Sequence, residues 1–206
     1  MNAAAPTVAG VILAAGESRR MGFPKALLSY RQETFLDTLI GLFSTRCCPV
    51  IVVLGGHAER IRQEASRVAS FVINPNFQRG MTTSLQCGLR LVPPASEGVL
   101  LTLVDHPAVA PSTLDALLAR PRPLLRVPRF GEKRGHPIWF SHELIPEFLA
   151  LPEDAPARDV VHSHFAKAEF LDLNDPGIVA DIDDPDAYEK LLGRSSPTAQ
   201  RAALRR

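Results

Sequence analysis

Cysteine is scarce in this sequence, which contains only three cysteines among its 206 residues. Cys47 and Cys48 are adjacent and Cys87 stands alone, so the sequence shows neither a disulfide framework nor the paired spacing of a zinc site. We expect all three side chains to be small, buried apolar groups.

An excess of charge and a long apolar run are also missing. The formal net charge is +1 and charged residues make up 22% of the chain. The protein as a whole therefore has no positive electrostatic potential that would favour binding of nucleic acid, and we expect a site for a small molecule. No apolar run approaches the length of a membrane span, and residues 1–7 lack the basic and apolar regions of a signal peptide. We therefore expect a cytoplasmic protein whose partners include neither nucleic acid nor a membrane.

Two common phosphate-binding loops are absent as well. The spacing between Gly16 and Lys25 does not fit G-x-x-x-x-G-K-[ST], and Ala14 stands where G-x-G-x-x-G requires its first glycine. An oxidoreductase with a nucleotide-binding α/β domain is expected to carry the second loop and, about twenty residues later, an acidic ligand for the ribose. The missing loop argues against that class.

What the sequence does contain is a short apolar run that leads into a loop of small and basic residues. Residues 8–13 are apolar and partly β-branched, which predicts a strand buried on both faces. Gly16 and Ser18 follow, together with the cations Arg20 and Lys25. Small side chains let backbone N–H groups approach a ligand, and cations offset the charge of phosphate groups. This stretch therefore predicts a loop that binds a polyphosphate.

The following segments alternate between apolar strands and amphipathic helices. Residues 50–54 and 99–104 predict buried strands, and Thr34 is suited to cap a helix. Residues 58–68 predict a second helix whose apolar face includes Val68. This alternation predicts an α/β fold of three layers, in which a mostly parallel, Rossmann-like sheet carries helices on both faces.

The length of the chain suits one domain with a sizeable core. We expect a single domain over residues 1–193, and we find no internal repeats. Residues 194–206 are rich in arginine, serine and alanine and lack an apolar stripe, which predicts a flexible basic tail.

Two carboxylates stand where a ligand is expected. Asp105 follows the predicted strand 99–104, and ligands of open parallel sheets collect beyond the carboxyl ends of the strands. An aspartate that begins a turn is the competing interpretation of Asp105. Farther along, Asp184 before Pro185 suits a helix cap, which leaves Asp183 free for a ligand. Apart from this, the residues around Asp183 indicate only the acidic start of a helix.

The basic loop also matches a known pattern residue for residue. It resembles the L-A-A-G-x-S-x-R-M-G-x-x-K signature of the nucleotidyltransferases with a molybdopterin-guanylyltransferase-like fold. The matching residues are Leu13, Ala14, Ala15, Gly16, Ser18, Arg20, Met21, Gly22 and Lys25. The alternative, a glycine-rich turn between a strand and a helix with surface arginines, accounts for less of this pattern.

Later segments resemble one branch of that family, the molybdenum cofactor cytidylyltransferases. Residues 74–89 match N-P-x-x-x-x-G-M-x-x-S-L-x-x-G-L, and residues 134–137 match R-G-[NH]-P. Two positions depart from the family pattern, since His106 replaces the usual glutamine and Asp184 replaces the usual threonine. The second change is conservative for a helix cap, whereas the first leaves the contact made by that side chain open.

The resemblance implies a nucleotide-diphospho-sugar transferase-like fold and a nucleotidyltransferase activity. The implied reaction moves CMP from CTP to the phosphate of molybdenum-bearing molybdopterin and releases pyrophosphate, with Mg²⁺ as cofactor. By the same resemblance, Asp105 and Asp183 bind Mg²⁺. Arg20 neutralises the departing pyrophosphate, and Lys25 contacts the α-phosphate or the incoming phosphate. Arg20, Lys25 and Asp105 are therefore the catalytic candidates.

The resemblance also implies binding residues. The nucleotide is expected to contact Leu13, Ala14, Ala15, Gly16, Ser18, Gly80 and Ser84. His136 and Arg158 are candidates for binding the acceptor. His136 is equally suited to fix a turn, and for Arg158 the residues alone favour a solvated helix arginine. Near Gly80, the residues alone favour an ordinary helix capped by Thr82 or Thr83.

Other activities stay open at this point. Enzymes with the same fold also transfer nucleotides from GTP to molybdopterin, or from other nucleoside triphosphates to sugar phosphates or methylerythritol phosphate. A carrier or chaperone of the molybdenum cofactor without catalysis is a further alternative, although a carrier would not need Asp105, Asp183 and Lys25 together. A client molybdoenzyme, or the chaperone of one, is the protein partner that the resemblance implies.

Overall fold

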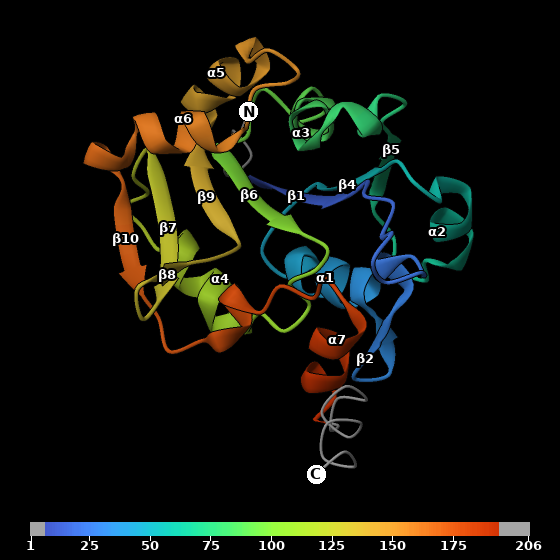
Figure 1. Cartoon of the computed structure of the whole chain (residues 1–206). Coiled ribbons are helices and arrows are strands. Elements are labelled where there is room, and N and C mark those ends of the chain that lie inside the picture. Colours follow the sequence, from blue (N-terminus) through green and yellow to red (C-terminus); the bar gives the residue numbers. More distant parts are fainter. Residues whose placement is uncertain (1–6, 194–206) are drawn as a thin grey trace, which may run out of the picture.

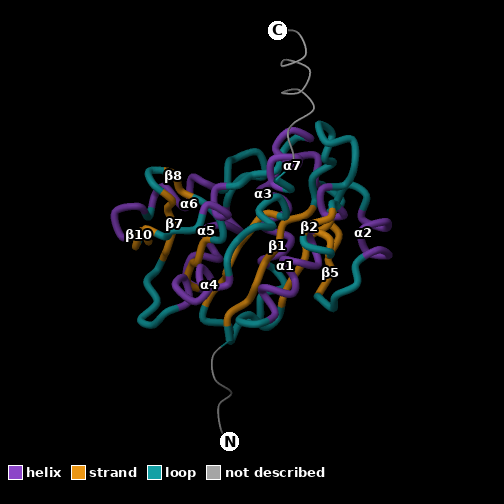
Figure 2. The backbone as a smooth tube through the Cα atoms, turned by 90° about the horizontal axis from the view of Figure 1, so that it is seen from below, coloured by secondary structure: helices purple, strands orange, loops and turns teal. Residues whose placement is uncertain are grey.

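A computed structural model describes residues 7–193 of the chain. A mixed sheet runs through its centre with the strand order β10-β7-β9-β6-β1-β4-β5, and β8 pairs with β7 (Figure 1). The strands of this sheet are β1 (Val8–Ala14), β4 (Val50–Leu54), β5 (Ser70–Ile73), β6 (Gly98–Leu103), β7 (Leu125–Phe130), β8 (Lys133–Arg134), β9 (Ile138–Ser141) and β10 (Glu169–Asp172). Figure 2 shows the same sheet from below, with β5 toward one end and β10 at the other.

The pairing of the strands is mostly parallel. Strand β1 pairs in parallel with β4 and β6, β4 with β5, and β10 with β7. Strand β9 is antiparallel to both of its neighbours, β6 and β7, and β8 is antiparallel to β7. A separate two-stranded ladder joins β2 (Ser29–Tyr30) to β3 (Glu33–Thr34). The predicted α/β fold with a mostly parallel sheet is confirmed.

Helices cover both faces of the sheet (Figure 1). One face carries α1 (Phe35–Ser44), α4 (Pro111–Leu118) and α7 (Pro185–Leu191), and α2 (Ala58–Glu64) joins the same core through Ile61. The other face carries α3 (Met81–Leu89), α5 (Ile145–Ala150) and α6 (Arg158–Ser163). Short 3₁₀ helices span Lys25–Leu27, Phe77–Arg79, His142–Leu144, Phe165–Lys167 and Pro176–Val179. No helix within residues 7–193 is long and apolar enough to span a membrane.

Strand β1 lies between the two cores, and every one of its residues is buried. Its side chains alternate, so that Val8 and Ile12 enter one core while Val11 and Leu13 enter the other. A strand with apolar neighbours on both sides has no solvent face, which explains its continuous apolar sequence. The strand ends at Ala14, where the basic loop begins.

The predicted helix caps form, but one predicted helix is shorter than expected. Thr34 accepts a hydrogen bond from the backbone N–H of Asp37, and Asp184 accepts one from Ala187. Helix α2 ends at Glu64, and the Val68 side chain is 93% exposed, so its predicted place on the apolar face of a helix is wrong. The buried Asp37 carboxylate explains the difference, because it accepts hydrogen bonds from the N–H groups of residues 66 and 67 and holds them outside the helix.

The cysteines are free thiols that differ in burial. Cys47 is buried, and this burial raises the pKa of its thiol to about 12. Cys48 is exposed and Cys87 is half-buried, so the expectation that all three are buried is wrong for these two. Cys48 lies in the turn between α1 and β4, where the preceding helix has already ended. The proposed tail at 194–206 lies outside the described residues.

A close backbone approach at Gly135 gives a prediction for stability. A Cβ atom on Gly135 would lie 2.1 Å from the carbonyl oxygen of Ile178, which is backbone and belongs to the 3₁₀ helix Pro176–Val179. We expect Gly135→Ala to lower the free energy of unfolding by about 3 kcal/mol, since the two segments must separate. Chemical denaturation measures this change. The matched control is Gly16→Ala, which meets no atom within 4 Å and is expected to change stability by less than about 0.5 kcal/mol. Equal stabilities of the two variants would contradict the steric argument.

Candidate active site

The loop after β1 folds around Ser18. The N–H groups of Met21 and Gly22 donate to the Ser18 carbonyl at 3.0 and 3.1 Å, and the N–H of Lys25 donates to the Ser18 hydroxyl at 3.0 Å. Ser18 and Gly22 take positive φ angles of 54° and 68°. The Ser18 side chain was predicted to contact a nucleotide. In this structure its oxygen fixes the backbone of Lys25 and thereby positions the lysine.

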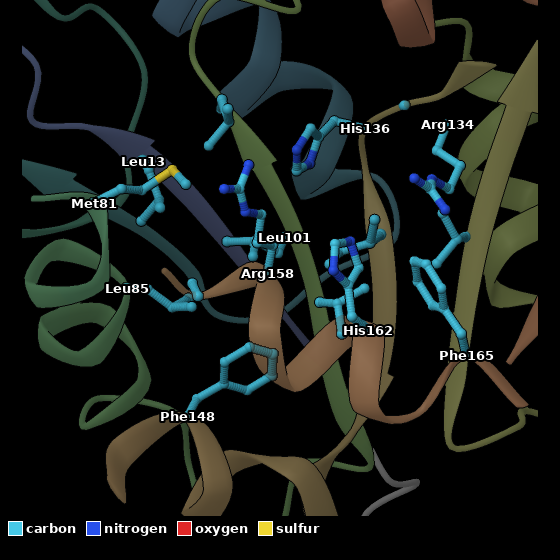
Figure 3. Close-up of a pocket in the computed structure, with 16 residues that line it drawn as sticks. Leu13, Met81, Leu85, Leu101, Arg134, His136, Phe148, Arg158, His162 and Phe165 are labelled. Atoms are coloured by element: carbon cyan, nitrogen blue, oxygen red, sulfur yellow. The ribbon is translucent and has the colours of Figure 1, made fainter. Parts of the chain in front are cut away.

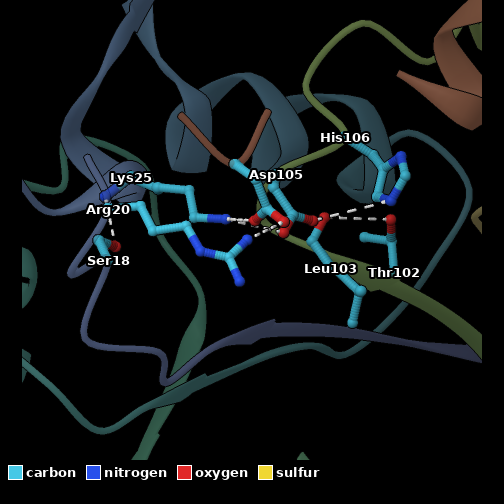
Figure 4. A network of polar contacts seen from close by, with 8 residues as sticks. Ser18, Arg20, Lys25, Thr102, Leu103, Asp105 and His106 are labelled. Atoms are coloured by element: carbon cyan, nitrogen blue, oxygen red, sulfur yellow. Dashed lines mark hydrogen bonds and ion pairs between the residues drawn. The ribbon is translucent and has the colours of Figure 1, made fainter. Parts of the chain in front are cut away.

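Lys25 reaches from this loop to two aspartates (Figure 4). Its Nζ lies 3.1 Å from Oδ2 of Asp105 and 2.5 Å from Oδ1 of Asp183. The guanidinium of Arg20 lies 3.5 Å from Oδ2 of Asp183, and 78% of the Arg20 side chain is exposed. The structure thus brings together the predicted catalytic residues and both predicted metal ligands.

A third carboxylate, Asp181, belongs to the same cluster. One oxygen atom each from Asp105, Asp181 and Asp183 lie within 4.8 Å of one another. The sequence interpretation missed Asp181, although the D-I-D spacing was visible, because residues two apart share a face only if the segment is extended. The backbone between Ala180 and Asp184 is indeed outside any helix or strand.

Asp183 reaches Asp105 by a long route. Asp105 follows β6 and Asp183 comes after β10, and these two strands run in the same direction, because β9 is antiparallel to β6 and β7 while β10 is parallel to β7. Their carboxyl ends therefore lie at the same edge of the sheet, but β7 and β9 separate the two strands. The chain returns through the 3₁₀ helix Pro176–Val179, which the buried Asp175 anchors by accepting hydrogen bonds from Ala110 N, Thr113 Oγ1 and Gly177 N. The N–H of Ile182 then donates to the Asp105 carbonyl at 3.1 Å. This backbone contact joins the two acidic segments.

The charges of the cluster influence one another. Burial raises the pKa of Asp181 to about 6, and the nearby charges of Asp105 and Asp183 act in the same direction. A hydrogen bond from Lys25 lowers the pKa of Asp183. Burial opposes the charged form of Lys25, but the hydrogen bond to Asp183 and the charge of Asp105 outweigh it and raise the pKa of this lysine. Lys25 therefore carries its positive charge in the site at neutral pH.

The donor set fits a hard divalent cation. Carboxylate oxygens are the ligands that Mg²⁺ and Mn²⁺ prefer, and one or two carboxylates commonly suffice when substrate phosphates supply the rest. Oδ1 of Asp105 is buried and has no hydrogen-bond partner among the described residues, which leaves a lone pair available for a cation. Asp105, Asp181 and Asp183 are therefore the residues that can hold such an ion.

A cavity of about 240 Å³, which we call the loop cavity, lies beside the basic loop. All seven predicted nucleotide-binding residues line it, together with Lys25 and Asp105; the seven are Leu13, Ala14, Ala15, Gly16, Ser18, Gly80 and Ser84. Phe77 and Ile61 also line the cavity and were not predicted. Phe77 stands inside the motif at 74–89, which was the available signal, whereas nothing local marked Ile61. Arg20 does not line the cavity, and most of its side chain is exposed.

The cap of α3 differs from the local prediction. The helix begins at Met81, so Gly80 occupies the capping position with a φ angle of 128°, and neither Thr82 nor Thr83 is the cap. The hydroxyls of Thr82 and Thr83 donate instead to the carbonyls of residues 155 and 80, at 2.5 and 2.9 Å. The start of α3 has no side-chain cap, so its first N–H groups lack a capping partner, and Gly80, Met81 and Ser84 of this segment line the loop cavity.

A second cavity of about 180 Å³, which we call the apolar cavity, adjoins the first (Figure 3). Both predicted acceptor residues, His136 and Arg158, line it. The His136 ring lies 5.2 Å from the His106 ring, measured between ring centroids. His106 is buried, and burial lowers its pKa. His106, which replaces a glutamine of the family pattern, therefore packs between Asp105 and His136.

The His136 side chain gives a prediction for the pH dependence of stability. Burial, followed by the nearby His106, lowers the pKa of His136 from 6.5 to about 4, although a hydrogen bond to the backbone of Leu101 and the charge of Asp105 favour its charged form. The unfolded chain therefore binds a proton at a higher pH than the folded chain, and stability is lost as pH falls from about 6.5 toward about 4. We expect His136 to account for about 2 kcal/mol of the loss at about pH 5. Urea titrations of wild type and His136→Gln measure it.

His106 contributes a loss of the same sign, because its pKa is also lowered by burial. The variant should therefore show a shallower dependence on pH between neutral and weakly acidic conditions, and not a flat one. His57→Gln, at an exposed histidine, is the control variant and should show the same dependence of stability on pH as wild type. A slope that is the same in His136→Gln and in wild type would contradict the assignment.

Comparisons with known proteins point in one direction. A family model described as the MobA-like NTP transferase domain matches residues 10–168. Nicotine blue oxidoreductase from Paenarthrobacter nicotinovorans is 30% identical over 200 residues, which cover 91% of this chain and 97% of the relative. Molybdenum cofactor cytidylyltransferase from Escherichia coli K12 is 26% identical over 182 residues, covering 86% of this chain and 92% of the relative.

Solved structures agree with the family match. The crystal structure of Rv0371c from Mycobacterium tuberculosis H37Rv is similar with a TM-score of 0.81 and 34% identity, covering 93% of this chain and 100% of the other. A second crystal structure of that protein is a complex with manganese, and it has a TM-score of 0.76 and 31% identity, covering 91% of this chain and 98% of the other.

Proposed function

The chain belongs to the family of MobA-like NTP transferase domains, and on that premise we propose that it transfers CMP from CTP to the phosphate of molybdenum-bearing molybdopterin and releases pyrophosphate. The observation that carries this proposal is the position of Lys25, which projects from the basic loop to Asp105 and Asp183 beside the loop cavity. A phosphate-binding loop, a cation and a cluster of carboxylates thus meet at one place. The relative from Escherichia coli K12, which is named a molybdenum cofactor cytidylyltransferase, supports the choice of CTP and of the acceptor.

In this proposal an oxygen of the acceptor phosphate attacks the α-phosphorus of CTP, and the bond from that phosphorus to the bridging oxygen of the β-phosphate breaks. Negative charge grows on the phosphoryl oxygens during the step, so that positioning and charge neutralisation supply most of the catalysis. Lys25, which is largely buried, places a fixed positive charge next to the α-phosphate. Arg20, whose side chain is largely exposed, offsets the charge of the departing pyrophosphate.

Asp105, Asp181 and Asp183 would hold a divalent cation, which would supply further positive charge beside the phosphates. The manganese complex of the Rv0371c protein supports a role for such an ion. The backbone N–H groups at the start of α3, beside Gly80 and Ser84, are suited to bind the edge of the base. The buried Asn74 amide donates to the Ser84 hydroxyl at 3.0 Å and fixes its position.

Pyrophosphate release tests the proposal directly. The protein is mixed with Mg²⁺ or Mn²⁺, molybdopterin that carries molybdenum, and CTP, GTP or ATP in turn. We expect release with CTP to be at least about tenfold faster than with GTP. A tenfold ratio is the difference in transition-state stabilisation that one polar contact to the base supplies. Faster release with GTP would correct the base. Binding of CTP without any release would indicate another acceptor, such as a sugar phosphate or methylerythritol phosphate, or a carrier of the cofactor.

A second candidate function is that of an oxidoreductase. It rests on the relative from Paenarthrobacter nicotinovorans, which is named nicotine blue oxidoreductase and matches over nearly its whole length. The sequence argument against this class is the missing dinucleotide loop. The basic loop stands in its place, and inside it the N–H of Lys25 donates to the Ser18 hydroxyl. Oxidation of NADH or NADPH with an added dye, measured on the same preparation, would support this candidate if it depended on the protein and survived without CTP.

A further inference from the structure

A third cavity borders residues 175–183, the segment that brings Asp181 and Asp183 back to Asp105 and that we call the strap. This strap cavity measures about 650 Å³, which is within the range of about 300–1,000 Å³ in which proteins bind small molecules. Its walls are the strap, helix α7 and the hairpin of β2 and β3, which contributes Tyr30 and Arg31. It shares no lining residue with the loop cavity or the apolar cavity, so it is a separate site.

Hydrogen bonds hold the walls of the strap cavity in place. Helix α7 and β2 lie side by side (Figure 1), and the Tyr188 hydroxyl on α7 donates to the Ser29 carbonyl at 2.9 Å. The strap is anchored at both ends, by the Asp175 carboxylate to the start of α4 and by the Ile182 N–H to the Asp105 carbonyl. A cavity whose walls are already positioned loses little conformational entropy when a ligand binds.

Three donor groups in this cavity lack a protein partner. Tyr30 is only 8% exposed, yet its hydroxyl makes no hydrogen bond within residues 7–193. The Arg31 guanidinium lies 5.0 Å from the centroid of the Tyr30 ring, and neither Arg31 nor Lys190 forms a salt bridge with a described residue. A phenol hydroxyl and two cations that share a cavity without an acceptor are suited to an anionic group.

The carboxylates that line the cavity are already engaged elsewhere. Asp175 accepts three hydrogen bonds, from Ala110, Thr113 and Gly177. Asp181 belongs to the acidic cluster, where the positive charge of Lys25 acts on it. Arg31 and Lys190 therefore keep their charge available to a ligand.

The rest of the lining is mostly small and aliphatic. It includes Ala108, Ala110, Val179, Ile182, Ala187 and Leu191. Ala187, Lys190 and Leu191 are three and four residues apart on α7 and so share one face of the helix. An aliphatic body next to the anionic group would gain apolar burial against this wall, whereas an inorganic anion would not.

We infer that the strap cavity binds a small molecule with a carboxylate or phosphate group on an aliphatic body, and that this ligand acts on the acidic cluster through the strap. The anionic group contacts Tyr30, Arg31 and Lys190. Asp181 lines the strap cavity and also belongs to the cluster that can hold a divalent cation. A ligand packed against the strap therefore changes the position of one of these carboxylates, which makes the cavity an effector site outside the two cavities of the proposed transfer.

A ¹H–¹⁵N NMR titration of the full chain locates the ligand without metal or CTP. The probes are hexanoate, hexyl phosphate and the neutral hexanamide, which all carry a short aliphatic chain. We expect both anions to bind at least about tenfold more tightly than hexanamide, with the largest shifts at Val179, Ala187 and Leu191. The anion that binds more tightly identifies the preferred group. Equal affinities of the three probes, or the largest shifts at Gly16 and Ser18 of the basic loop, would overturn the inference.

Two variants test the donors of the strap cavity. Lys190→Met keeps an aliphatic stem and should reduce the affinity for the preferred anion by about tenfold, while Tyr30→Phe should reduce it by about threefold. Lys167→Met, at an exposed lysine that does not line the cavity, is the matched control and should bind as wild type. Urea denaturation shows whether the variants stay folded. Unchanged affinity in both folded variants would contradict the assignment of the donors and overturn the inference.

The affinity for Mn²⁺ measures the action of the ligand on the acidic cluster. Electron paramagnetic resonance of free Mn²⁺ gives the Kd, which should change by at least about fivefold when the preferred anion saturates the protein. Bound Mn²⁺ should change the affinity for the anion by the same factor, because coupling between two sites is reciprocal. The same Kd with and without the anion would overturn the effector role. A protein that binds no Mn²⁺ would contradict the proposed metal site and the effector role with it, while the NMR titration decides the ligand site independently.

Discussion

Asp105→Asn is expected to reduce pyrophosphate release by about 10³-fold while the protein stays folded. The substitution keeps the shape of the side chain but removes the negative charge that faces Lys25 at 3.1 Å and that the buried oxygen Oδ1, which accepts no hydrogen bond within residues 7–193, shares. Both the binding of a divalent cation and the orientation of Lys25 depend on that charge. Initial rates with saturating CTP and a range of Mg²⁺ concentrations measure the effect.

The stability of the same variant separates catalysis from folding. Asp105, Asp181 and Asp183 repel one another, so removing one charge relieves repulsion at the same time as it removes the contact with Lys25. We therefore expect the free energy of unfolding to change by less than about 1 kcal/mol. Asp154→Asn, at an exposed aspartate far along the chain, is the matched control and should behave as wild type. Activity of Asp105→Asn within tenfold of wild type would remove this residue from the mechanism.

Lys25→Met is expected to produce the second large effect, and it has two parts. Pyrophosphate release should fall by about 10²-fold to 10³-fold, because a fixed positive charge beside the α-phosphate is lost. The melting temperature without metal should also fall, because the three carboxylates lose the ammonium group that lies 2.5 Å from Asp183 and 3.1 Å from Asp105.

Addition of Mn²⁺ should then restore the stability of Lys25→Met. An ion that binds only the folded protein stabilises it in proportion to its affinity, and that affinity rises when a competing cation is removed. Thermal melts with and without Mn²⁺ should therefore show a larger metal-induced increase in the variant than in wild type. Lys167→Met, at an exposed lysine outside the site, serves as the control. An equal increase in all three proteins would show that Lys25 and the ion do not share these carboxylates.

Much of the fold follows from local patterns in the chain. The continuous apolar run at 8–13 predicted the buried strand β1, and the caps at Thr34 and Asp184 were visible as single residues. The loop of small and basic residues borders the loop cavity, as its composition predicted, whereas the full set of seven nucleotide-binding residues, all of which line that cavity, was implied by the family resemblance. These features are readable because periodicity, side-chain volume and capping act over a few residues.

The remaining features depend on contacts between distant segments, which no local pattern contains. Helix α2 ends at Glu64 because Asp37, far away in sequence, binds the following N–H groups. Asp181 joins the acidic cluster because Ile182 donates to the carbonyl of Asp105 across the return of the chain. The apolar cavity likewise exists only where strands and helices from distant parts of the chain meet. The sequence alone therefore determined the strand, the basic loop and the family, while tertiary packing determined which carboxylates meet Lys25 and which side chains enclose the neighbouring cavity.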